Sequence, residues 1–273
     1  MKQKLKIGFI GCGAIGSRLA KSVQHDLKDQ CVISGLYDLA PEKPIALAHS
    51  LRLKPALIKR SLSALIASSD FIVEAIASNE TEKIIHQVVT AGKGILIMSV
   101  GKVLNIPSLF QIAEKNSVAV LIPSGAIAGL DTIKAVGADH ISRISLTTRK
   151  PPTSLNQTQY LTHKRIFINK IKKETVIFQG SVDRSIVLFP RNINVAAALA
   201  LASGARDKIR VRIITSPHFK TNSHEITVEG KFGSLTTHTH NLPCPDNPKT
   251  SYLAVLSALQ TLKQYFQSVK IGT

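Results

Sequence analysis

The first half of the chain alternates short apolar runs with longer amphipathic segments. Five apolar runs, rich in β-branched residues, have the composition of strands buried on both faces: Leu5–Ile10, Cys31–Tyr37, Phe71–Ala75, Gly94–Met98 and Val118–Ile122. Four helical patterns lie between them: Ser17–His25, Pro41–Leu53, Glu80–Ala91 and Ser108–Lys115. Strands that alternate with helices in this way predict an α/β fold with a doubly wound parallel sheet.

The pattern changes after Ala138. Ile141–Thr148 alternates apolar and polar residues, so one face of this strand is expected to contact water, as in an antiparallel sheet. Residues 150–159 and 241–248 are interpreted as loops. Further strands and helices are expected at Ile193–Ala202, Lys208–Thr215, Glu225–Glu229, Ser234–His240 and Thr250–Val269. A second, mixed-sheet α+β domain is therefore predicted.

The segment Gly11-Cys12-Gly13-Ala14-Ile15-Gly16 directly follows the first strand and opens the first helix. In the Rossmann fold such glycines allow a tight turn, a close approach of a pyrophosphate and close helix packing, while the helix N-terminus attracts the phosphates. Asp38 ends the next strand, where a carboxylate accepts hydrogen bonds from the adenosine ribose. We therefore expect a dinucleotide, and the short chain favours NAD, with NADP possible, over FAD. The cofactor-binding residues predicted here are Gly11, Gly13, Ala14, Ile15, Gly16 and Asp38.

The formal net charge of +18 raises the question of nucleic-acid binding. The charges are dispersed, aromatic residues make up 5% and there is no Trp, so stacking platforms for bases are scarce. We interpret the charge as a solvated surface that attracts an anionic cofactor and substrate, and we expect no nucleic-acid partner.

Three cysteines without CxxC spacing make a disulfide framework unexpected. His238, His240 and Cys244 approach the composition of a zinc site, but alternation along an exposed strand explains the two histidines equally well, so no metal is predicted. No apolar run reaches the ~18 residues of a membrane helix, and no signal-peptide cleavage site follows Met1. We expect a cytoplasmic protein without a membrane partner.

Several later segments resemble the L-aspartate dehydrogenase family, in order and over nearly the whole chain. They are Ile122–Asp131, Leu146–Pro152, Phe189–Ala197, Asn222–Ile226, Gly230–Gly233 and Asn247–Ser251. The resemblance implies oxidation of L-aspartate by NAD or NADP to iminoaspartate, which feeds NAD biosynthesis or hydrolyses to oxaloacetate and ammonia.

The resemblance also implies residue roles. The family's active-site histidine falls on His224, and its further cofactor contacts fall on Ala126 and Asn192. Because the family's C-terminal helix returns to the dinucleotide domain, we expect that domain to comprise 1–125 plus 245–273, and the substrate domain 126–244. A homodimer is expected. Thr148, Arg149 and Lys249, with Lys150, are candidates to hold the dicarboxylate substrate.

Two positions depart from the family pattern. Ser216-Pro217 stands where an Asp-Pro pair is expected, and Lys102 where a small residue is usual. His218 competes with His224 as the catalytic histidine. Two other functions stay open: a different Rossmann dehydrogenase, such as one resembling homoserine dehydrogenase or dihydrodipicolinate reductase, and a non-catalytic NAD-binding sensor.

Overall fold

The computed structural model describes residues 3–272 except 77, 156, 190–192 and 246, and gives only the backbone of 247–249. The chain divides into two compact units. Unit 1 comprises Met1–Pro123 and Val255–Val269, and unit 2 comprises Ser124–Ala254 and Lys270–Thr273. Compared with the expected division, the first junction lies two residues earlier and the return to unit 1 begins at Val255 instead of residue 245.

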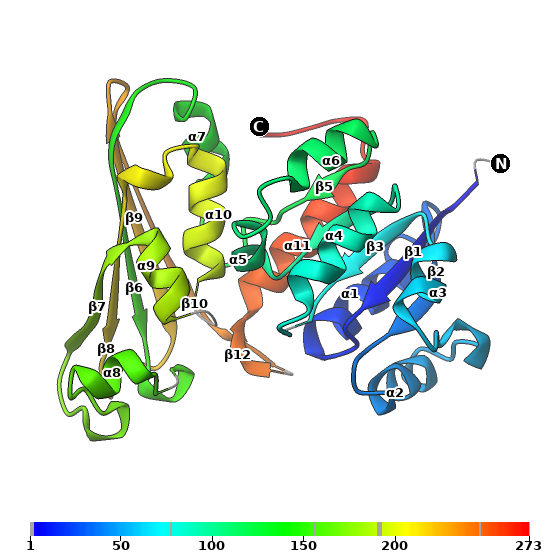
Figure 1. The fold of residues 1–273 in the computed structure, drawn as a ribbon, viewed down its shortest axis with the longest axis horizontal. Coiled ribbons are helices and arrows are strands. Elements are labelled where there is room, and N and C mark those ends of the chain that lie inside the picture. The colour runs from blue at the N-terminus through cyan, green and yellow to red at the C-terminus, as the bar shows by residue number, and fades with distance from the viewer. Residues whose placement is uncertain (1–2, 77, 156, 190–192, 246, 273) are drawn as a thin grey trace. The chain divides into compact units, whose positions relative to one another are not determined.

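Unit 1 contains a five-stranded parallel sheet, as the apolar runs predict (Figure 1). Its strand order is β2-β1-β3-β4-β5, with β1 at Leu5–Ile10, β2 at Cys31–Tyr37, β3 at Phe71–Glu74, β4 at Gly94–Ile97 and β5 at Val120–Leu121. The helices of this unit are α1 (Ala14–His25), α2 (Glu42–Ser50), α3 (Leu62–Ala67), α4 (Thr81–Thr90), α5 (Val100–Val103), α6 (Leu109–Lys115) and most of α11 (Tyr252–Phe266).

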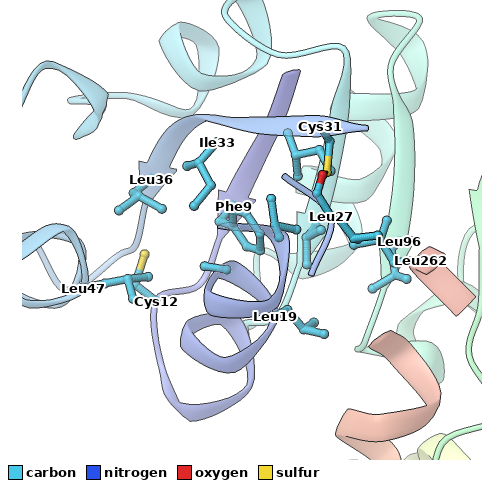
Figure 2. Packing of buried hydrophobic residues seen from close by; sticks show 14 of the residues in the cluster. Phe9, Cys12, Leu19, Leu27, Cys31, Ile33, Leu36, Leu47, Leu96 and Leu262 are labelled. Carbon is cyan, nitrogen blue, oxygen red and sulfur yellow. The ribbon is translucent and has the colours of Figure 1, made fainter. Parts of the chain in front are cut away.

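A hydrophobic core joins the sheet of unit 1 to its helices. Phe9, Leu19 and Leu36 are at most 1% exposed, and Figure 2 shows them gathered between β1, β2 and α1. Leu262 of α11 is fully buried in the same cluster, and the ring of Tyr265 lies 5.3 Å from that of Phe71. The C-terminal helix therefore packs on the parallel sheet although more than 130 residues of unit 2 precede it.

Unit 2 is built on a mixed five-stranded sheet of order β10-β9-β6-β8-β7. Only β6 and β8 are parallel neighbours; the other pairs are antiparallel. The strands are β6 (Ile141–Lys150), β7 (Thr175–Ser181), β8 (Ile209–Thr215), β9 (Asn222–Gly230) and β10 (Gly233–Asn241). Both units together confirm the predicted fold class.

Helices cover one face of this second sheet. α7 (Leu130–Val136), α9 (Val182–Leu188) and α10 (Asn194–Ser203) lie on one side, as Figure 1 shows, and the short α8 (Gln159–His163) follows the loop after β6. Successive strand residues point to opposite faces, so Leu146, Ile213 and Ile226 are buried beneath these helices.

One expectation about loops was wrong. Residues 241–248 were interpreted as a loop, yet β11 (Pro243–Cys244) pairs antiparallel with β12 (Asn247–Ser251). These strands are short, so hydrophobic periodicity does not reveal them. The loop expected at 150–159 connects β6 to α8, and its described part contains one short 3-10 turn, Pro152–Ser154, before Thr158 caps the first turn of α8.

Candidate functional site

The glycine turn of unit 1 is constrained by contacts within the unit. Gly11 has φ +97°, a left-handed conformation that disfavours a side chain, and a Cβ added there would lie 2.4 Å from the carbonyl oxygen of Ala75. A Cβ at Gly16 would lie only 1.8 Å from the carbonyl oxygen of Gly11. These two glycines let α1 begin directly against the ends of β1 and β3.

Gly13 differs from the other two glycines, because no heavy atom outside Gly13 and its two chain neighbours lies within 4 Å of the position that its Cβ would take. It is the N-cap residue of α1 and carries no side-chain cap, and Ala14 and Ile15 form the first turn. The amides of that turn and the helix dipole attract an anionic group. A space that only a missing side chain keeps open, next to such amides, fits the pyrophosphate of a dinucleotide.

Asp38 lies immediately after β2 and is held against the glycine turn. Its Oδ2 accepts a hydrogen bond from the backbone N–H of Cys12 at 2.7 Å, and its Oδ1 accepts one from Ala40 at 3.0 Å. Lys43 Nζ is 3.8 Å from Oδ1. Each carboxylate oxygen keeps a further lone pair, so ribose hydroxyls can still donate to a carboxylate that is already oriented.

Sequence reasoning missed a buried carboxyl group at the end of β3. Glu74 is fully buried, and its oxygens accept hydrogen bonds from the backbone N–H of Ile76 and of Ser99 at 2.9 and 3.0 Å. Burial raises the pKa of Glu74 above its ordinary value. The group ties the loop after β3 to the start of α5; an acidic residue ending an apolar strand was the available signal.

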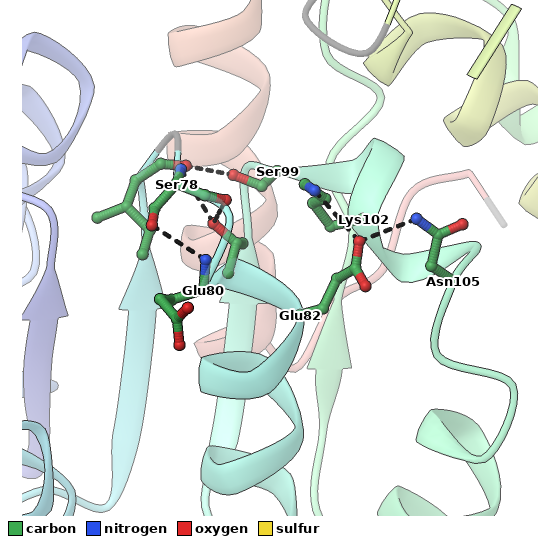
Figure 3. Close-up of polar contacts among 8 residues, drawn as sticks. Ser78, Glu80, Glu82, Ser99, Lys102 and Asn105 are labelled. Atoms are coloured by element: carbon green, nitrogen blue, oxygen red, sulfur yellow. Dashed lines mark hydrogen bonds and ion pairs between the residues drawn. The ribbon is translucent and has the colours of Figure 1, made fainter. Parts of the chain in front are cut away.

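Figure 3 shows the surroundings of that loop. Ser99 donates to the carbonyl oxygen of Ile76, and Ser78 accepts from the backbone of Glu80. Lys102, which departs from the family pattern, forms an ion pair with Glu82 at 3.2 Å. Here its charge is paired within unit 1.

The predicted catalytic histidine lies on the buried face of the second sheet. His224, in β9, is 4% exposed, and its Nδ1 lies 3.0 Å from Oγ1 of Thr148, the residue directly opposite in β6. Burial, with the charge of Lys150, lowers the pKa of His224 to about 3, so the imidazole is neutral at physiological pH. Burial also lowers the pKa of Lys150 to about 8. His218, the competitor, is exposed in the turn before β9.

The remaining predicted cofactor- and substrate-binding residues are Ala126, Arg149, Asn192 and Lys249. The carbonyl oxygen of Ala126 accepts hydrogen bonds from Thr239 and Asn241 of β10, at 2.9 and 3.0 Å. Arg149 follows Thr148 and therefore points to the opposite face of the sheet, where it pairs with Glu225 at 3.1 Å. Asn192 lies outside the described residues, and of Lys249 only the backbone, in β12, is described. The structure thus brings Thr148 to His224 but not Arg149.

The suggested zinc ligands do not converge. The rings of His238 and His240 are 4.4 Å apart on the exposed face of β10, whereas Cys244 is 1% exposed. In the described part of the chain, no three His, Cys, Asp or Glu side chains are grouped to hold a metal ion. No described helix has the length and apolar character needed to cross a bilayer.

The protein combines a Rossmann unit, whose glycine turn can bind an anion, with a mixed-sheet unit that contains a buried histidine. This combination defines the class of two-domain dehydrogenases that use a pyridine nucleotide. Comparisons with known proteins agree with this class. Residues 11–123 match the family model described as homoserine dehydrogenase, NAD binding domain, and residues 131–265 match that described as aspartate dehydrogenase, C-terminal.

Full-length relatives narrow the class further. The chain is 41% identical to the L-aspartate dehydrogenase of Methanosarcina mazei and 39% identical to that of Methanosarcina barkeri, with 98% of this chain and 100% of each relative covered. It therefore belongs to the L-aspartate dehydrogenase family. The crystal structure of aspartate dehydrogenase from Thermotoga maritima shares the fold, with a TM-score of 0.74 and 23% identity over 99% of this chain and 100% of that one.

Proposed function

We propose that this protein is an oxidoreductase that oxidises L-aspartate to iminoaspartate with NAD as the preferred cofactor and NADP as a usable one. Membership in the L-aspartate dehydrogenase family over the full chain is the observation that carries the reaction. The imine then enters NAD biosynthesis or hydrolyses to oxaloacetate and ammonia.

Asp38 supports the preference for NAD. Its carboxylate is held at the end of β2 by the N–H of Cys12, at the position where the 2′-phosphate of NADP is accommodated in Rossmann enzymes. Like charges repel, which favours the free 2′-hydroxyl of NAD. Lys43, 3.8 Å from the carboxylate, weakens this repulsion and keeps NADP usable.

The amine must first lose the proton that makes it an ammonium ion. The Cα–H bond of the neutral amine then breaks with both electrons, and the nitrogen lone pair forms the C=N bond of an iminium ion, which loses an N–H proton to become the neutral imine. The nicotinamide ring supplies the hydride acceptor when it is bound. His224 is neutral and can accept the ammonium proton of the substrate. The negative charge of a bound dicarboxylate would raise the pKa of His224 from about 3 toward neutrality.

Thr148 is proposed as a positioning residue for His224. With Nδ1 hydrogen-bonded to Thr148, the ring is held in one orientation and Nε2 is the nitrogen left for the substrate. Ala126, Asn192, Arg149 and Lys249 stay predictions as cofactor- or substrate-binding residues.

The deciding experiment follows absorbance of the reduced nicotinamide with L-aspartate, L-glutamate, L-alanine and L-homoserine, each with NAD and with NADP. We expect turnover with aspartate, faster with NAD, and a much lower kcat/KM for glutamate. Equal activity with alanine, which lacks the second carboxylate, would contradict recognition of a dicarboxylate. Turnover of homoserine alone would favour the alternative dehydrogenase, and dinucleotide binding without turnover would favour a sensor.

We also propose a homodimer and a cytoplasmic location. One face of the second sheet carries no described helix, which leaves it available to a second copy, and the three cysteines are free, as is typical of a reducing compartment. Sedimentation velocity at micromolar concentration tests the dimer; a monomer throughout would contradict it.

A further inference from the structure

Polar residues form a row across the buried face of the second sheet, one step along the strands from Thr148 and His224. Lys150 ends β6 and is the register partner of Thr215 in β8. Asn222 begins β9 and is the register partner of Asn241 in β10. Since Thr148 pairs with His224 and Arg149 with Ser223, the β6–β9 ladder places Lys150 next to Asn222. This polar row comprises Thr215, Lys150, Asn222 and Asn241.

The polar row contains most of the unsatisfied acceptors found in the described residues. Four buried side-chain oxygens in the described residues lack a hydrogen-bond partner. One is Gln24 Oε1 in unit 1, and the three in the polar row are Thr215 Oγ1, Asn222 Oδ1 and Asn241 Oδ1. These three residues are 0%, 9% and 2% exposed. A buried acceptor without a donor costs about 1–3 kcal/mol. Two amide oxygens and one hydroxyl without partners in one row are groups to which a bound molecule can hydrogen-bond, and the amide oxygens can only accept hydrogen bonds.

The orientation of Asn241 is set by its other contacts. Its Nδ2 donates to the carbonyl oxygen of Ala126 at 3.0 Å and to Thr239 Oγ1 at 3.2 Å. Its amide oxygen is therefore the atom left for a donor. Lys150 adds a positive charge at the same place, close enough to contribute to the low pKa of His224.

We propose that Lys150, Asn222 and Asn241 form the substrate subsite beside His224, with Lys150 binding a carboxylate and the two amide oxygens accepting hydrogen bonds from the substrate's amino group. The proposal rests on the proposed function, because it names the residues that recognise an amino dicarboxylate. The subsite recognises two different groups of the substrate: the cation of Lys150 binds one carboxylate, and the two amide oxygens accept hydrogen bonds from the amino group, which carries the hydrogens.

Arg149 is the competing cation. It precedes Lys150 in sequence but occupies the other face of the sheet, and its charge is already paired with Glu225. Arg212 of β8 is exposed on that same outer face and provides a matched control for the loss of one positive charge.

The test compares Lys150→Met, Asn222→Leu, Arg149→Met and Arg212→Met in the full-length enzyme with NAD. The readouts are KM for L-aspartate and the inhibition constant of succinate, a dicarboxylate without an amine. Hydrogen bonds to charged groups of this kind correspond to about 10- to 100-fold in affinity. Lys150→Met should raise both constants by that factor. Asn222→Leu should raise KM for aspartate but leave succinate inhibition within about twofold. Arg212→Met should change neither, and the dissociation constant of NAD should be unchanged throughout.

Two outcomes would overturn the subsite: Arg149→Met weakening both ligands while Lys150→Met does not, or Asn222→Leu weakening succinate as much as aspartate. Thermal melting of each variant identifies misfolding; if Lys150→Met does not fold, Lys150→Gln replaces it, and Asn222→Leu remains an independent test. If the wild-type protein does not oxidise aspartate, the proposed function is wrong, but this result does not decide whether the subsite exists. Stabilisation of the protein by succinate, lost in Lys150→Met, then still decides whether a dicarboxylate binds at the polar row.

Discussion

Burial determines how His224 titrates. Its pKa is lowered from 6.5 to about 3, so between these values the unfolded chain binds a proton at this position and the folded protein does not. The free energy of unfolding should therefore fall as the pH is lowered from 6.5 toward 3. Urea denaturation of wild type and His224→Gln at neutral and acidic pH measures this. The variant should lose less stability on acidification; an identical loss in both proteins would contradict a buried, neutral His224.

The same residue is expected to carry the proton transfer. General base catalysis of this kind contributes about 10²- to 10⁴-fold, so His224→Ala should lower kcat by at least about 100-fold with NAD binding nearly unchanged. His218→Ala should have a much smaller effect, because His218 is exposed in a turn. Steady-state kinetics with a cofactor titration tests both variants. An active His224→Ala beside an inactive His218→Ala would reverse the assignment.

Asp38 is the residue proposed to determine the preference for NAD over NADP. Asp38→Ala removes the carboxylate that disfavours a 2′-phosphate, so the ratio of kcat/KM for NAD to that for NADP should fall by about tenfold or more. The variant also leaves the N–H of Cys12 without its acceptor. Asp38→Asn, which keeps an acceptor without the charge, separates the two effects. An unchanged ratio in both variants would show that Asp38 does not contact the ribose.

At the level of elements, the turn between β1 and α1 contains one glycine required for packing, Gly16, and one proposed to make room for the cofactor, Gly13. Gly16→Ala should destabilise the protein, since the new methyl would overlap the carbonyl oxygen of Gly11. Gly13→Ala should leave the melting temperature nearly unchanged, because the new methyl group would have no atom beyond the adjacent residues within 4 Å, yet it should weaken NAD binding by filling the pyrophosphate space. Melting curves and NAD titrations check both. Full NAD affinity in Gly13→Ala would place the pyrophosphate elsewhere.

The whole molecule carries a net charge of +18, and its proposed ligands are anions. Such a charge accelerates the encounter with anionic ligands, and salt screens it over about 10 Å at 0.1 M. We therefore expect kcat/KM for aspartate to fall as ionic strength rises from about 0.02 to 0.5 M. Sodium chloride and sodium sulfate compared at equal ionic strength provide the control, since screening gives one curve for both. A kcat/KM independent of salt would mean that the charge plays no part in capture.

Local sequence patterns determined much of this protein by themselves. Five short apolar runs with β-branched residues, separated by helical patterns, predicted the parallel strands, and a glycine turn between strand and helix predicted a phosphate-binding loop, because both patterns depend on neighbours within a few residues. Asp38 was predicted as a cofactor residue from its position at a strand end, and His224 as the catalytic residue from a family segment.

Only the tertiary structure decided how residues far apart in the chain meet. Thr148 and His224 are 76 residues apart, and strand register alone makes them hydrogen-bond partners. The same register, continued by one residue, brings Lys150 next to Asn222, and Arg149 lies on the other face because neighbouring strand residues alternate sides. The burial that shifts the pKa values of Glu74 and His224 arises from side chains contributed by several elements, and no local pattern records it.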